Sequence, residues 1–365
     1  MVRMLILTLL ALFFLNNCKG KKQIDDDSLK VSVSKTAKLK KIREFVLKED
    51  TYLLGNISQW NNYITRNGDL YIVDQKNRNV VHYDSLGRFV GVVGKKGHGP
   101  GEYARPLRVS VDADGLVYIG DTERSYEVVY DKNNRFVTEF RVHEGKLYPG
   151  GMRFADEVRV VCAYVYTGCV RYENVNLFHV YDSKNNLLRR IRMNYPEKIK
   201  EWDDAAALYP HWFIKNNLIY IAYFPLSKIY IYDLQGKQQK VYNLSPEFFK
   251  QQDKKVKSSM NKMETIKAMS QSGSNTHSLQ DLGNNYIFYS YYNEELPENF
   301  KIYDLWKYRT YYYEVIDEDG YVINTESSKL PGGPIGYTDG ALLYILSEKS
   351  DSRTIGVYKI EIREN

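Results

Sequence analysis

The 365-residue sequence predicts an all-β fold, and three observations carry this prediction. Tyrosine occurs 33 times, and tyrosine favours half-buried positions on pleated sheets. With 43% hydrophobic residues and only 10 prolines, the chain can bury a large core. The third observation is an internal repeat of about 50 residues, a period that suits the blades of a β-propeller.

The repeat is clearest in two consecutive segments of the chain. Residues 69–91 contain three short strands, and the same pattern returns in residues 115–138. Weaker copies follow at residues 178–188, 218–237, 286–322 and 340–358. Polar turns containing Asp, Asn and Gly separate the strands, so each unit is expected to be a four-stranded antiparallel meander.

Five aspartates that follow the third strand of a unit measure the period. They are Asp84, Asp131, Asp182, Asp233 and Asp317, at intervals of 47, 51, 51 and 84 residues. A helical insert at about 245–270 accounts for most of the longer last interval. Six units close a ring, so the predicted fold is a six-bladed β-propeller with one helical insert.

The sixth unit stops one strand short, and the N-terminal part of the chain offers the missing strand. Residues 39–47 carry apolar side chains that could face a sheet if a bulge adjusts their alternation. We expect this segment to pair beside Val357–Ile360, because closing the ring removes two exposed sheet edges.

The insert reads as an amphipathic helix. Ser245 is a suitable N-cap, and Pro246 suits the first helical position. Apolar residues then recur at three- and four-residue steps from Val256 to Met269. Such a helix would pack against the rim of the propeller, or act as a lid over its channel or as a docking helix for a partner.

The first 17 residues read as an export signal. An apolar run too short to span a membrane ends at Asn16 and Asn17 and is followed by Cys18 and several lysines. Residues 15–18 resemble a bacterial lipobox, although Asn17 replaces the usual small residue, and the resemblance implies lipidation of Cys18. An ordinary secretory peptide with a free cysteine is the alternative. Polar residues 18–38 read as a flexible tether to a propeller spanning 39–365.

This arrangement predicts a domain held in the cell envelope by its lipid, facing the periplasm or the cell surface. The outer membrane is favoured over the inner one. The two remaining cysteines, Cys162 and Cys169, could face each other in a hairpin as a disulfide or remain two thiols. Neither zinc-binding spacing nor any other metal or cofactor motif is present, so we expect no metal and no cofactor.

The segment from residue 94 to 131 resembles the NHL repeat. It contains Gly94-Lys-Lys-Gly-His-Gly-Pro-Gly-Glu-Tyr103 and then Asp112-Ala-Asp-Gly-Leu-Val-Tyr-Ile-Gly-Asp121. The Gly-Pro-Gly-Glu variant is similar to six-bladed β-propeller lipoproteins of Bacteroidetes. The resemblance implies the fold and export, and it implies no particular activity, since NHL-type propellers include binders of protein and RNA as well as lyases.

Candidate binding residues gather on one face of the predicted ring. In a meander, the connections between units and the second-to-third strand turns lie on the same side, which we call the ligand-side face. Residues that break the repeat there should serve a ligand rather than packing. The candidates are Trp60, His98, Glu102, Arg105, Arg124, His211, Trp212 and Arg309, with Arg153 among further residues of that face. The alternative for Gly97–Tyr103 is a purely conformational loop with Glu102 capping local amides.

Two functions follow from these observations. The favoured one is a non-catalytic binding module for a glycan, a peptide or an envelope protein, and the alternative is a polysaccharide lyase or hydrolase that uses the ligand-side cleft. Motifs of common hydrolases and nucleotide-binding proteins are absent from the sequence. The net charge of +6 arises from 51 basic and 45 acidic residues, which does not indicate a nucleic-acid partner.

Overall fold

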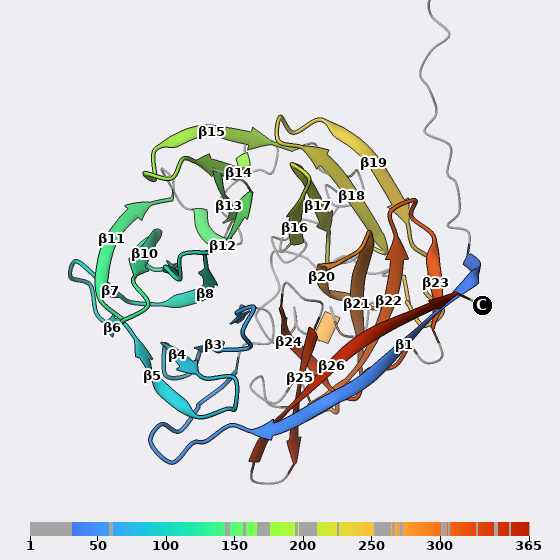
Figure 1. The fold of residues 1–365 in the computed structure, drawn as a ribbon, viewed down its shortest axis with the longest axis horizontal. Coiled ribbons are helices and arrows are strands. Elements are labelled where there is room, and N and C mark those ends of the chain that lie inside the picture. Colours follow the sequence, from blue (N-terminus) through green and yellow to red (C-terminus); the bar gives the residue numbers. More distant parts are fainter. Residues whose placement is uncertain are drawn as a thin grey trace, which may run out of the picture.

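The protein is described by a computed structural model. It describes residues 31–57, 61–142, 147–155, 158–165, 176–193, 196, 210–224, 226–251, 264, 267–268, 270, 273–300, 305, 307–325, 328–338, 342–349 and 352–364. These residues form a ring of six four-stranded antiparallel blades, as the repeat predicts (Figure 1).

The first three blades follow one another along the chain. The first contains β2 (Tyr63–Ile64), β3 (Leu70–Asp74), β4 (Asn79–Tyr83) and β5 (Phe89–Val93). The second contains β8 (Pro106–Val111), β9 (Val117–Asp121), β10 (Tyr126–Tyr130) and β11 (Phe136–Arg141). The third contains β12 (Leu147–Ala155), β13 (Val158–Val165), β14 (Asn176–Tyr181) and β15 (Leu187–Arg192). Between the first two blades, β6 (Lys95–Lys96) and β7 (Glu102–Tyr103) form a small parallel pair.

The last three blades complete the ring. The fourth contains β16 (His211–Lys215), β17 (Leu218–Ala222), β18 (Lys228–Asp233) and β19 (Gln238–Asn243). The fifth contains β20 (Asn275–Gly283), β21 (Tyr286–Glu294), β22 (Arg309–Asp317) and β23 (Val322–Thr325). The sixth contains β24 (Gly333–Tyr337), β25 (Leu342–Lys349), β26 (Ser352–Glu364) and β1 (Val31–Val46). In the second to sixth blades, the first strand of the blade (β8, β12, β16, β20 or β24) lies nearest the ring centre (Figure 1).

The N-terminal strand β1 closes the ring beside β26, which confirms the prediction. Leu39 pairs with Ile360, and the register shifts between Lys41 and Arg43, where the expected bulge occurs. The two long strands run side by side along the lower right of Figure 1. Closure leaves no unpaired edge on β26.

The strand starts at Val31, so the prediction of a flexible tether up to residue 38 was wrong for its last residues. The N-terminal end of β1 also pairs in parallel with β23, with Val31 opposite Val322 and Ala37 opposite Thr325. This pairing joins the fifth and sixth blades into one eight-stranded sheet. Ala37 is fully buried in the cluster that contains Ile323 and Ile360, which holds this segment in place.

The aspartates that measure the repeat build its turns. In each of the five turns, one carboxylate oxygen accepts hydrogen bonds from the backbone amides two and four residues later, as Asp84 does from Leu86 and Arg88. The residue three positions after each aspartate has a left-handed backbone conformation, and it is Gly or Asn each time, as in Gly87 and Asn134. The aspartate spacing therefore reports one turn geometry that the structure uses in five blades.

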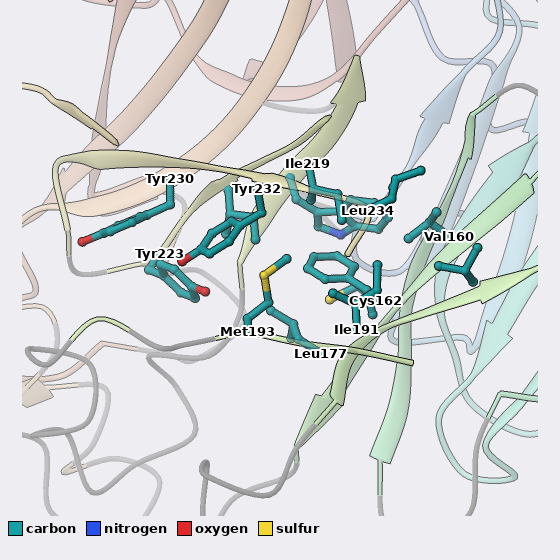
Figure 2. Close-up of a cluster of buried hydrophobic side chains, with 14 of the residues drawn as sticks. Val160, Cys162, Leu177, Ile191, Met193, Ile219, Tyr223, Tyr230, Tyr232 and Leu234 are labelled. Atoms are coloured by element: carbon teal, nitrogen blue, oxygen red, sulfur yellow. The ribbon is translucent and has the colours of Figure 1, made fainter. Parts of the chain in front are cut away.

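Hydrophobic side chains fill the space between neighbouring blades. Figure 2 shows the cluster between the third and fourth blades, where Val160, Cys162 and Ile191 of one blade meet Ile219 and Tyr232 of the other. Cys162 is a free cysteine, and burial raises the pKa of its thiol to about 12, so it is unreactive at neutral pH. Cys169, its suggested partner, lies outside the described residues.

The insert does not begin as a helix at Ser245. Phe249 donates a backbone hydrogen bond to Pro246, which closes a turn instead. The rings of Phe248 and Phe249 pack on Tyr312 and Tyr291 of the fifth blade, so aromatic packing holds this part of the chain in a turn. Helical conformation is found at residues 264, 267, 268 and 270, and most of the remaining insert lies outside the described residues.

Candidate functional site

The glycine-rich segment from residue 94 to 103 folds as a self-contained loop. Glu102 accepts a hydrogen bond from the amide of Gly99 at 3.0 Å and pairs with Lys95 at 2.8 Å. The Lys95 ammonium and these amides lower the pKa of the Glu102 carboxyl. A Cβ built on Gly97 would lie 1.9 Å from a Glu102 carboxylate oxygen, so the Glu102 side chain packs directly over Gly97 and would have to shift to admit a larger residue there. These contacts correspond to the conformational alternative for Glu102.

Arg124 ties this loop to the second blade. Its Nη2 atom donates to both carboxylate oxygens of Glu139 at 2.9 and 3.1 Å, and its Nη1 atom donates to the backbone carbonyl of Glu102. The side chain is 14% exposed, and its guanidinium lies 4.9 Å from the ring centre of Tyr126. The donors of Arg124 thus serve the protein itself, although the sequence suggested a free cation.

His98 lies in this loop and Arg105 lies just after it, and both side chains are exposed at the surface. The His98 side chain is 71% exposed, and its Nε2 atom lies 3.7 Å from Glu123. Arg105 is exposed, and its backbone amide donates to the buried carboxylate of Asp121 at 3.1 Å. With Glu102 and Arg124, these residues form one group at the junction of the first and second blades.

Arg309 lies inside the fifth blade. Its Nε atom donates to Glu294 at 2.6 Å, and its guanidinium lies over the ring of Tyr292 at 4.3 Å. Glu294 is the residue directly opposite Arg309 in the β21–β22 pair. The two side chains are 10% and 5% exposed, so this ion pair is part of the core. Trp60 and Cys18 lie outside the described residues.

His211 and Trp212 line a cavity in the central channel. The cavity has a volume of about 50 Å³, and every blade contributes to its wall. One lining residue from each blade, in ring order, is Asn62, Arg108, Arg153, His211, His277 and Tyr337. Of the eight candidate residues, only His211 and Trp212 line this cavity, so the prediction that the candidates meet at one site holds only for these two.

Trp212 is buried rather than available for stacking. It is 2% exposed, and its ring packs edge to face against Phe178 at 4.8 Å. The guanidinium of Arg153 lies 5.5 Å from the centre of the Trp212 ring. Trp212 supports Arg153 and the core between the third and fourth blades, whereas the sequence suggested an exposed aromatic surface.

Two imidazoles in the cavity are held neutral. Burial is the main cause that lowers the pKa of His277 to about 3, and its Nε2 atom lies 3.0 Å from the Pro334 carbonyl. Burial also lowers the pKa of His211 well below its usual range, and His277 and Arg108 add to that shift. At neutral pH the two rings are therefore uncharged, and the guanidinium groups of Arg108 and Arg153 supply the positive charge.

Sequence reasoning missed Arg108 and placed Arg153 on a connection. Arg108 is 8% exposed in β8, and Arg153 lies in β12. The available signal was a single charged residue inside an otherwise uncharged first strand of a blade, as in Pro106-Leu-Arg-Val-Ser-Val111. In a propeller such a residue can point into the channel.

A larger cavity lies at the fifth blade, away from the predicted residues. Its volume is about 390 Å³, and its lining includes Glu247, Glu295 and the stacked rings of Phe248 and Tyr312. None of the eight candidate residues lines it.

No cluster of three or more potential metal ligands occurs within the described part of the chain. The Asp112 segment forms a turn, in which its carboxylate accepts amide hydrogen bonds from Asp114 and Leu116. Likewise, none of the helices in the described part is long and apolar enough to cross a bilayer.

The fold and the channel define a six-bladed β-propeller with a small, basic central cavity. Residues 42–201 match the family described as DUF5128: 6-bladed beta-propeller. None of the curated proteins matches the sequence.

Solved structures share the fold at low sequence identity. A member of the DUF4221 family from Bacteroides vulgatus ATCC 8482 is 15% identical, with a TM-score of 0.68 over 90% of this chain and 99% of that one. A protein of Bacteroides fragilis NCTC 9343, described as "Putative exported protein (BF0058)", is 14% identical, with a TM-score of 0.54 over 90% and 95%. Virginiamycin B lyase from Staphylococcus aureus is 10% identical, with a TM-score of 0.50 over 88% and 99%. These similarities establish the propeller fold.

Proposed function

We propose that this protein is an exported, non-catalytic binding module, anchored through a lipid on Cys18, whose central channel receives part of a glycan, a peptide or an envelope protein. The observation that carries the proposal is the cavity to which all six blades contribute. Its wall contains Arg108, Arg153 and His211, which differ from one blade to the next, while the strand residues shared by the blades build the core. Side chains that depart from the repeat are those free to serve a ligand.

The alternative function is a lyase or hydrolase, and one observation favours it. His211 and His277 lie in the same cavity, and imidazoles commonly act as acids and bases. However, both rings have a pKa below the usual range, and the described lining contains no carboxylate as a second acid–base group. Binding without turnover is therefore the function we favour.

Glycan and peptide arrays probed with the purified full chain test the proposal, followed by product analysis of every hit. We expect a ligand that is bound without chemical change. The variant His211→Ala should weaken its binding, and the matched variant His98→Ala, which alters an exposed histidine far along the ring, should not.

Two results would contradict the proposal. A new product formed from the ligand would identify an enzyme. A loss of binding in His98→Ala alone would move the site to the junction of the first and second blades.

A further inference from the structure

The channel cavity is positively charged. Arg108 and Arg153 lie in its wall, and the described lining residues include no Asp or Glu. Arg108 comes from β8 and Arg153 from β12, and a Cβ built on Gly151 of β12 would lie 2.8 Å from Arg108 Cδ, so the Arg108 side chain lies against the strand that carries Arg153. Arg309 adds no net charge nearby, because Glu294 neutralises it at 2.6 Å.

Uncharged polar groups complete the wall. Ser278 Oγ lies 2.7 Å from Tyr337 Oη, and the ring of His277 is fixed by the Pro334 carbonyl. Hydroxyls can turn to donate to an anion, whereas a carboxylate in the wall would repel one. The wall therefore combines two fixed charges with adaptable donors.

The size of the cavity limits what can enter. A water molecule needs about 10–15 Å³ of such volume, so a cavity of about 50 Å³ holds only a few waters. A carboxylate, sulfate or phosphate group fills a similar space, while a sugar ring is larger. Trp212 borders the cavity but is only 2% exposed, and its ring packs against Phe178 and the Arg153 guanidinium rather than facing a ligand.

We infer that the channel binds one oxyanion group, a carboxylate, sulfate or phosphate, through Arg108 and Arg153. This inference rests on the proposed binding function, and it identifies the part of the ligand that enters the ring. A guanidinium group donates two parallel hydrogen bonds to an oxyanion, which gives it geometric selectivity over a simple charge.

Calorimetric titration of the full chain with sodium sulfate, inorganic phosphate and sodium acetate tests this inference. Sodium chloride keeps the ionic strength constant, because non-specific screening would otherwise mimic binding. We expect at least one of the three anions to bind, and the preferred anion distinguishes a tetrahedral group from a carboxylate.

The variant Arg153→Gln should weaken that binding at least about tenfold, which corresponds to about 1.4 kcal/mol. Arg153→Lys keeps the charge and loses the bidentate geometry. Its affinity for the anion should therefore lie between that of Arg153→Gln and that of the parent protein. The exposed Arg105→Ala should leave the affinity unchanged. Urea unfolding of each variant verifies that the ring is intact.

The outcomes separate the inference from the proposed function. Equal anion binding by the parent and by Arg153→Gln would overturn the inference. An array ligand that depends on His211 but not on Arg153 would overturn the inference while the binding function stands. If no array ligand and no anion binds, both fail.

Discussion

Replacing Arg124 by alanine should destabilise the propeller, and replacing Arg105 should not. The Arg124 guanidinium binds the backbone carbonyl of Glu102, in the loop before β8, and the carboxylate of Glu139, in the outer strand β11. It therefore joins the loop to that strand. Arg105 is exposed, and its hydrogen bond to Asp121 comes from the backbone amide. The two arginines therefore form a matched pair of charges with different structural roles.

The expected loss of folding stability in Arg124→Ala follows from the contacts of the Arg124 side chain. Hydrogen bonds to charged groups contribute about 1.5–3 kcal/mol each when buried, and partial exposure of the pair reduces this value. The Arg124 and Glu139 side chains are 14% and 20% exposed, so we expect Arg124→Ala to lower the free energy of unfolding by about 2–3 kcal/mol. For a propeller of roughly 330 residues, with an unfolding entropy of ~2.1 cal/mol/K per residue, this loss lowers Tm by about 3–4 °C.

Scanning calorimetry and urea unfolding of four variants measure this effect. They are Arg105→Ala, Arg124→Ala, Glu139→Gln and the double variant Arg124→Ala/Glu139→Gln. Arg105→Ala should stay within about 0.5 kcal/mol of the parent protein. The double variant should lose less stability than the two single variants together, with a coupling energy of about 1–2 kcal/mol.

An Arg124→Ala variant with the Tm of the parent would refute the reasoning. Absence of coupling with Glu139 would have the same meaning, because the guanidinium would then contribute nothing through this ion pair. In either case Arg124 would return to the set of side chains available to a ligand.

Three further predictions concern the anchor, the ring closure and a buried acid. Cys18→Ala should abolish lipid labelling and release the protein from the membrane fraction; unchanged fractionation would contradict the anchor. Ala37→Asp should cost at least about 3 kcal/mol in urea unfolding, because it places an unpaired carboxylate in a fully buried site, whereas Asp at the neighbouring exposed Lys38 should cost far less. Burial raises the pKa of Glu127 to about 8, so folding loses stability as pH rises from about 4.3 towards 8. Glu127→Gln should therefore be near neutral at pH 4 and stabilising by roughly 3 kcal/mol at pH 7, and equal effects at the two pH values would exclude an uncharged buried glutamate.

The sequence was sufficient to predict the ring because the same turn-forming residues recur in successive blades. Each aspartate such as Asp84 or Asp233 fixes a turn through its own backbone contacts, so local chemistry marks the same place in five blades. The early start of β1 at Val31 was not predictable in this way. The N-terminal end of β1 pairs through its backbone with β23, which lies more than 280 residues later in the chain. No side-chain pattern in the sequence predicts this pairing.

The candidate site was harder to predict because a charge does not reveal its partner. Arg309 and Glu294 are 15 residues apart and meet only because the β21–β22 register places them directly opposite each other. Arg124 and Glu139 are also 15 residues apart, on the two sides of a different hairpin connection. Recognising that either arginine is paired within the protein requires knowledge of strand register that the sequence alone does not contain.

The positions of the channel charges carry an implication for how a ligand would sit. Arg108 and Arg153 come from the second and third blades, while the fourth to sixth blades contribute neutral groups such as His211, His277 and Tyr337. The positive potential is therefore strongest on one side of the channel, although the blades surround it completely. An acidic group in the channel would be drawn toward Arg108 and Arg153, and the neutral part of the same ligand would face the remaining blades. This asymmetry arises because the blades share their turns and their cores but differ in the strands that line the channel, so a repeated fold can hold one ligand in one orientation.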